Sequence, residues 1–86
     1  MKSIKPIVLT QDKQFIETPM KGKKSAPVVN VTYNGSMPVL WFEWFGTTQN
    51  EVREFHTVET GKSVKDTAKY IGSVGNDLRL VHVFEV

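Results

Sequence analysis

Residues 28–45 read VVNVTYNGSMPVLWFEWF, and this stretch decides the fold. Apolar and polar residues alternate over residues 28–33, which is the period-two pattern of a half-buried β-strand. Asn34 and Gly35 follow, and this pair tolerates the positive φ angles that a tight turn requires. The stretch therefore predicts a β-hairpin whose second strand covers residues 37–45.

That second strand is apolar on both faces. Alternation places Val39, Trp41 and Phe45 on one face and Leu40, Phe42 and Trp44 on the other. A strand that faces water on one side has one polar face, so this pattern indicates a central strand or a strand whose second face meets a partner.

Further segments on either side also have the composition of β-strands. Ile4–Leu9 and Phe15–Thr18 are interpreted as a first hairpin, and residues 19–27, which hold two prolines, as a loop. Strands are also expected at Val52–Val58, Tyr70–Val74 and Leu78–Glu85. The sequence thus predicts a mainly β protein, either a small antiparallel sheet or a partly open barrel of six or seven short strands.

Two finer features are expected within this architecture. Ser63 and Asp66 have the spacing of a capping box, which allows at most one short helix near residues 63–71. Pairing the strand at 37–45 with the strand at 52–58 can set Glu43 opposite Arg53 and Trp41 opposite Phe55, and opposite charges and aromatic pairs favour that register.

Length and composition favour a single domain over residues 1–86. Hydrophobic residues make up 40% of the chain and charged residues 23%, which is typical of a globular protein and not of a disordered one. There is no cysteine, which excludes disulfides and thiolate chemistry. A core this small gains stability from association, so a homo-oligomer is one expected state.

The net charge of +2 is unevenly distributed, because residues 1–24 carry six lysines and two carboxylates. This charge is too low for a dedicated nucleic-acid binder and has the wrong sign for an acidic DNA mimic. The N-terminus lacks the apolar segment of a signal peptide, and the run Val39–Phe45 is interrupted by Glu43 and too short to span a membrane. A cytosolic location without membrane contact is expected.

Few residues could carry catalytic or metal chemistry. A site that combines His56, His82 and Glu54 would require adjacent strands with matching faces, and otherwise the histidines are structural. Residues 60–63, TGKS, resemble the end of a phosphate-binding loop but lack its upstream glycine and the following long helix, so they are interpreted as a turn. The prediction is a protein that is not an enzyme and has no catalytic residue, metal or cofactor.

Several short motifs occur in an order that resembles a family of short, uncharacterised proteins of tailed bacteriophages and prophages. They are Glu17-x-Pro19, Asn34-Gly35-x-x-Pro38-x-Leu40-Trp41, Arg53-x-Phe55, Thr60-Gly61, Tyr70-Ile71-Gly72 and Val81-His82-Val83-Phe84-Glu85. The resemblance covers nearly the whole chain, but the aromatic cluster at 41–45 and the lysine-rich stretch at 21–24 depart from the pattern. It implies a phage origin and a location in the cytoplasm of the infected bacterial host, and it implies no specific activity.

Protein binding needs less specialised chemistry than catalysis, because an exposed aromatic strand face is sufficient. The predicted binding surface is formed by Trp41, Trp44 and Tyr33 with the loop lysines Lys21, Lys23 and Lys24. The expected partner is a host bacterial protein, for example a component of antiviral defence, which the protein inhibits. The same residues leave an alternative open, the binding of single-stranded nucleic acid or of a nucleotide signal.

Overall fold

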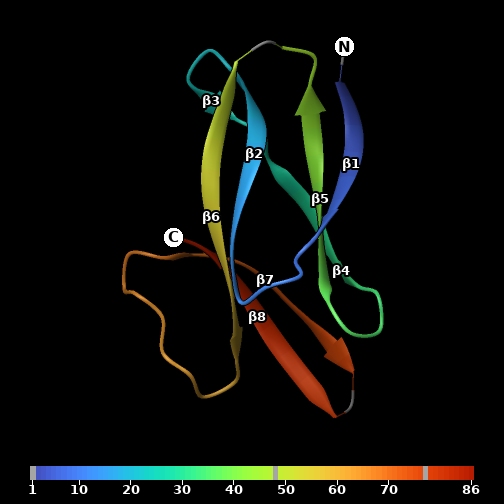
Figure 1. Ribbon diagram of the computed structural model, residues 1–86, viewed down its shortest axis with the longest axis vertical. Coiled ribbons are helices and arrows are strands. Elements are labelled where there is room, and N and C mark those ends of the chain that lie inside the picture. Colours follow the sequence, from blue (N-terminus) through green and yellow to red (C-terminus); the bar gives the residue numbers. More distant parts are fainter. Residues whose placement is uncertain (1, 48, 77) are drawn as a thin grey trace.

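The computed structural model describes residues 2–47, 49–76 and 78–86, and every regular element within them is a β-strand (Figure 1). The eight strands are β1 (Lys2–Val8), β2 (Lys13–Lys21), β3 (Lys24–Ser25), β4 (Val28–Tyr33), β5 (Pro38–Phe45), β6 (Asn50–Glu59), β7 (Lys69–Asn76) and β8 (Arg79–Glu85). The mainly β prediction is confirmed, although it counted only six or seven strands. No helix in the described residues is long and apolar enough to cross a membrane.

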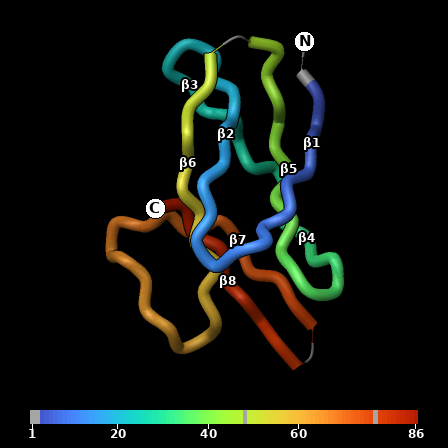
Figure 2. The backbone as a smooth tube through the Cα atoms, viewed as in Figure 1, coloured from blue at the N-terminus to red at the C-terminus, as the bar shows by residue number. Residues whose placement is uncertain are grey.

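The strands form two antiparallel sheets, with the orders β1-β5-β4 and β3-β2-β6-β8-β7. The five-stranded sheet curls into an open half-barrel, and Figure 2 shows the chain passing from β1 in one sheet to β2 in the other. The central position predicted for β5 is confirmed, because β1 and β4 pair with its two edges. Both faces are largely buried: Leu40 and Phe42 on one face are inaccessible, and Val39 and Phe45 on the other are 7% and 8% exposed. The core lies between the sheets and includes Leu9, Ile16, Leu40, Phe42, Phe55 and Val83.

The predicted hairpin of β4 and β5 is confirmed, with Tyr33 opposite Pro38. The side-chain oxygen of Asn34 accepts hydrogen bonds from the backbone N–H groups of Ser36 (3.2 Å) and Met37 (2.8 Å). Gly35 has a φ of 98°, a conformation that side chains disfavour. The residue pair that signalled the turn in the sequence therefore forms it.

β1 and β2 do not form the predicted first hairpin, because β1 pairs with β5 and β2 pairs with β6. At the corner between them, Gln14 Oε1 accepts hydrogen bonds from the backbone N–H groups of Thr10 (2.8 Å) and Gln11 (3.3 Å). Gln14 Nε2 donates to the carbonyl of Val8 at 3.3 Å. The side chain thus satisfies backbone groups that a hairpin turn would otherwise pair.

The segment 19–27, predicted as a loop, contains the end of β2 and all of β3. Pro19 fits inside β2 because its neighbour Met20 donates its N–H toward β6, to the carbonyl of Gln49 at 2.9 Å. Backbone nitrogens of successive residues point to opposite edges of a strand, so the nitrogen of Pro19 points away from β6. No hydrogen-bond donor is required on that edge. The chain turns at Gly22, whose φ is 63°.

The short helix predicted near residues 63–71 is absent from the described chain. Residues 60–68 connect β6 to β7 without regular structure, apart from two turns. In these turns Lys62 N–H donates to the carbonyl of Glu59 at 3.1 Å, and Ala68 N–H donates to the carbonyl of Lys65 at 3.0 Å. A helix this short is not stable without tertiary support. In addition, residues 69–71 belong to β7, which pairs with β8.

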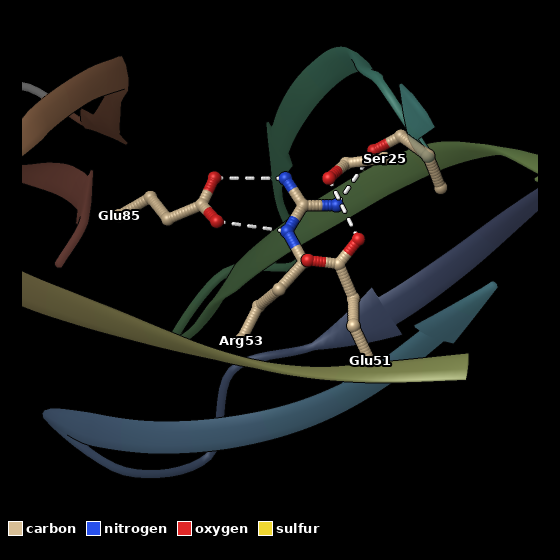
Figure 3. A network of polar contacts seen from close by, with 5 residues as sticks. Ser25, Glu51, Arg53 and Glu85 are labelled. Carbon is tan, nitrogen blue, oxygen red and sulfur yellow. Dashed lines mark hydrogen bonds and ion pairs between the residues drawn. The ribbon is translucent and has the colours of Figure 1, made fainter. Parts of the chain in front are cut away.

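The predicted pairing of β5 with β6 is also wrong, because these strands lie in different sheets. Arg53 is instead bound by Glu85, to which its Nε and Nη2 each donate at 2.8 Å (Figure 3). Its Nη1 donates to the carbonyl of Ala26 at 2.6 Å. The guanidinium lies 5.5 and 5.3 Å from the ring centroids of Phe42 and Phe55, so this buried cation joins the two sheets.

Candidate functional site

The five-stranded sheet has one face toward the core and one face toward solvent. On β6, Arg53 and Phe55 point inward and are 8% and 1% exposed, so alternation directs Glu54 and His56 outward. The pairing of β6 with β2 and β8, and of β8 with β7, extends this assignment across the sheet. We call the outward side the outer face, and its members are Lys13, Phe15, Glu17, Val52, Glu54, His56, Val58, Tyr70, Ser73, Leu80, His82 and Phe84.

Several large apolar side chains on the outer face are exposed to solvent. Phe15, Val52 and Tyr70 are 68%, 66% and 55% exposed. Phe84 lies beside Tyr70 with its ring nearly perpendicular, at a centroid distance of 5.5 Å. Phe15 and Val52 are diagonal neighbours on β2 and β6, and the contact between Glu54 and His56 separates them from the pair Tyr70 and Phe84. Two exposed apolar groups on one face make the outer face the candidate site.

A β-bulge sets the composition of this face at β7. The register of β7 and β8 shifts between Tyr70 and Gly72, so that Tyr70 is opposite Phe84 and Ser73 is opposite His82. Regular alternation would put residues 70 and 73 on opposite faces, whereas the extra residue at the bulge puts both on the outer face.

Four polar side chains form a connected chain there. Tyr70 and Ser73 share a hydrogen bond between their hydroxyls at 2.5 Å, and Ser73 Oγ lies 2.6 Å from Nδ1 of His82. Nε2 of His82 lies 2.9 Å from the hydroxyl of Thr60. A serine beside a histidine suggests nucleophilic catalysis, but both ring nitrogens of His82 contact hydroxyls and no carboxylate orients the ring in the described part of the chain. The arrangement links β7, β8 and the turn after β6.

The histidines and Glu54 do lie on one face of adjacent strands, as a shared site would require. His56 contacts Glu54 on its own strand through Nε2, whereas His82 is bound by Ser73 and Thr60. No group of three potential metal-binding side chains occurs among the residues that the structure describes. The two histidines therefore belong to separate hydrogen-bonded groups.

The two tryptophans of the predicted surface do not share one face. Trp41 and Trp44 are three positions apart on β5, so alternation turns them in opposite directions, and both are half-buried. Trp44 packs on the core, edge-on to Phe42 at 6.3 Å between ring centroids. Trp41 Nε1 donates to the hydroxyl of Thr32 at 2.7 Å.

The remaining residues of the predicted surface lie at two ends of the molecule. Lys21, Lys23 and Lys24 are exposed around the turn from β2 to β3, whereas Tyr33 ends β4 at the hairpin on the far side (Figure 1). Lys24 Nζ lies 6.0 Å from the ring centroid of Phe45. The structure thus brings one lysine next to the end of β5 and separates the lysines from Tyr33. The binding role of these residues stays a prediction.

Sequence reasoning missed the outer face, although the sequence held a signal for it. Phe15 and Ile16 are adjacent on β2, and so are Val83 and Phe84 on β8. Two successive large apolar residues on a strand cannot both face the core. Ile16 and Val83 are the buried members, at 5% and 0% exposed, so their neighbours are directed outward.

Comparison with known proteins identifies a family for the chain. A family model described as "Domain of unknown function (DUF7352)" matches residues 1–86. No curated protein and no solved structure matches the chain. The family match covers the whole chain and assigns no activity to it.

Proposed function

The chain belongs to the family described as a domain of unknown function, DUF7352, and from its geometry we propose that it is a binding protein that docks onto another protein through its outer face. The observation that supports this proposal is the exposure of Phe15, Val52 and Tyr70 on one side of a sheet. Aromatic side chains such as those of Phe15 and Tyr70 are enriched at the cores of protein interfaces, where a few residues carry most of the binding energy.

Charges around Phe15 indicate the chemistry of the partner. Lys13 and Glu17 flank the ring on the same face of β2. A complementary surface has an apolar pocket for the ring, with an acidic group on one side and a basic group on the other. Glu17 and Glu54 would repel the phosphates of a nucleic acid, so the outer face favours a protein partner.

The resemblance to phage proteins supports a narrower version of this proposal. In that version the protein acts in the cytoplasm of an infected bacterium, and the partner is a host protein such as a component of antiviral defence. Occupying a functional surface of the target is sufficient to inhibit it, and this requires no catalytic group on the phage side.

The variant Phe15→Lys tests the proposal, because the ring is 68% exposed and its replacement leaves the core intact. Ile4→Lys is the matched control, since Ile4 is 55% exposed and lies on β1 of the other sheet. In affinity capture from nuclease-treated bacterial lysate, the wild type and Ile4→Lys should retain the same host protein in stoichiometric amount. Phe15→Lys should bind that protein at least about 30-fold more weakly, as expected for loss of a central interface residue.

Other outcomes would contradict the proposal in distinct ways. Equal retention by Phe15→Lys and Ile4→Lys would exclude the outer face as the docking surface. Retention that disappears with nuclease would favour the nucleic-acid alternative. A dimer in light scattering that Phe15→Lys dissociates would identify a second copy of this chain, and not a host protein, as the occupant.

A further inference from the structure

A cavity lies at the end of the five-stranded sheet, where β6 extends beyond the first residue of β2. Its volume is about 380 Å³, and it is distinct from the exposed apolar side chains of the outer face. Its lining includes Lys13 of β2, His56 and Val58 of β6, Lys62 and Ser63 of the following turn, and Arg79 of β8. Basic and hydroxyl groups from distant parts of the chain therefore converge on one space.

The charge of this lining is positive. Lys13, Lys62 and Arg79 face the two carboxylates Asp12 and Glu59. Arg79 pairs with Glu59 at 3.3 Å, whereas neither lysine forms an ion pair within the described part of the chain. Two lysines against a single remaining carboxylate make the cavity attractive to an anion.

The turn after β6 fixes two of the lining residues. Lys62 N–H donates to the carbonyl of Glu59 at 3.1 Å, and Gly61 has a φ of 90°, which glycine adopts far more readily than other residues. This tight turn holds Lys62 and Ser63 beside the end of β6. A lysine followed by a hydroxyl residue supplies the types of donor that bind phosphate oxygens in nucleotide-binding loops.

We infer that this cavity binds a small phosphate ester, with Lys13, Lys62 and Ser63 as ligands of the phosphate. The volume is sufficient for one small molecule. Val58 provides an apolar contact for the remainder of the ligand.

Titration of the full chain, followed by amide chemical shifts in NMR, tests the inference with inorganic phosphate, ribose 5-phosphate and acetate at constant ionic strength. Both phosphates should cause saturable shifts at Lys13, Lys62 and Ser63, and acetate should cause none. Lys62→Ala should weaken phosphate binding about tenfold or more, as expected for loss of one charge-assisted contact. Lys65→Ala is the matched control, because Lys65 is exposed in the same connection and is not part of the lining.

Equal phosphate affinity of Lys62→Ala and Lys65→Ala would overturn the site. Shifts that grow without saturation would also overturn it, and equally tight acetate binding would show a general anion site in place of a phosphate site. Both lysines are exposed, so the variants should keep the wild-type spectrum. Lys13 lies next to Phe15 on the outer face, so the variant that separates the two proposals is Val52→Ser, which adds no charge and lies outside the lining. It should weaken docking and leave phosphate binding unchanged.

Discussion

Removing Glu85 should destabilise the protein more than removing its partner Arg53. In Glu85→Ala the guanidinium of Arg53 keeps its bond to the carbonyl of Ala26 but loses both carboxylate bonds, while its side chain is only 7% exposed. An uncompensated buried charge costs about 3–5 kcal/mol, and we expect about 3 kcal/mol because water can reach part of the site.

Arg53→Met should cost less, about 1–2 kcal/mol, since it orphans the carbonyl of Ala26 but leaves a carboxylate that is 23% exposed and can be hydrated. Methionine also retains contact with the rings of Phe42 and Phe55. The double variant should be no less stable than Glu85→Ala, because the charge that made the single variant costly is then gone.

Urea denaturation followed by tryptophan fluorescence measures these free energies. A chain of 86 residues is expected to have a free energy of unfolding of about 4–13 kcal/mol. With a denaturant dependence of about 1 kcal/mol per M, Glu85→Ala should lower the midpoint by about 3 M. A cost below about 1 kcal/mol for Glu85→Ala, or costs that add in the double variant, would refute the role assigned to this ion pair.

Two further predictions concern single side chains. Gly75→Ala should lower the thermal unfolding midpoint far more than Gly22→Ala. A Cβ at position 75 would lie 1.9 Å from the carbonyl oxygen of Arg79, whereas nothing lies within 4 Å of a Cβ at position 22. Equal shifts of the midpoint would contradict the close approach of β7 and β8 at Gly75. Thr32→Val removes the acceptor of the indole N–H of Trp41, so it should lower the free energy of unfolding by about 1 kcal/mol and change the fluorescence of Trp41. Thr32→Ser keeps the hydroxyl and should resemble the wild type. Equal loss of stability in both variants would assign the effect to packing.

The features that the sequence predicted correctly depend on short-range interactions. Asn34 bonds to residues two and three positions ahead of it, so the β4–β5 hairpin could be inferred from neighbouring residues. The period-two pattern likewise located most strands, because burial of one face is a property of each strand separately. These interactions are present in the sequence as local patterns.

The errors arose where distant segments decide the structure. Arg53 and Glu85 are 32 positions apart, and their contact depends on β8 pairing beside β6. The first hairpin failed because β1 and β2 pair with different strands, while Gln14 satisfies the corner between them. Local patterns cannot distinguish a hairpin from a corner between two sheets when both connections are short and polar.

The candidate site shows the same limit. The outer face needs the order of β2, β6, β8 and β7, and the bulge near Gly72, before its members can be grouped. The aromatic residues of β5 are adjacent in the sequence, but Phe42 and Phe45 are buried in the core and Trp44 packs against it. Adjacency in sequence was a poor guide to a shared surface.

Site-specific photocrosslinking tests the docking proposal most directly. A benzophenone amino acid is placed at Phe15 on the outer face or at Ile4 on the opposite sheet, and both proteins are irradiated in bacterial cells. The account predicts an adduct with one host protein from position 15 and none from position 4. Adducts of equal yield from both positions, or an adduct with the target from position 4 alone, would contradict it.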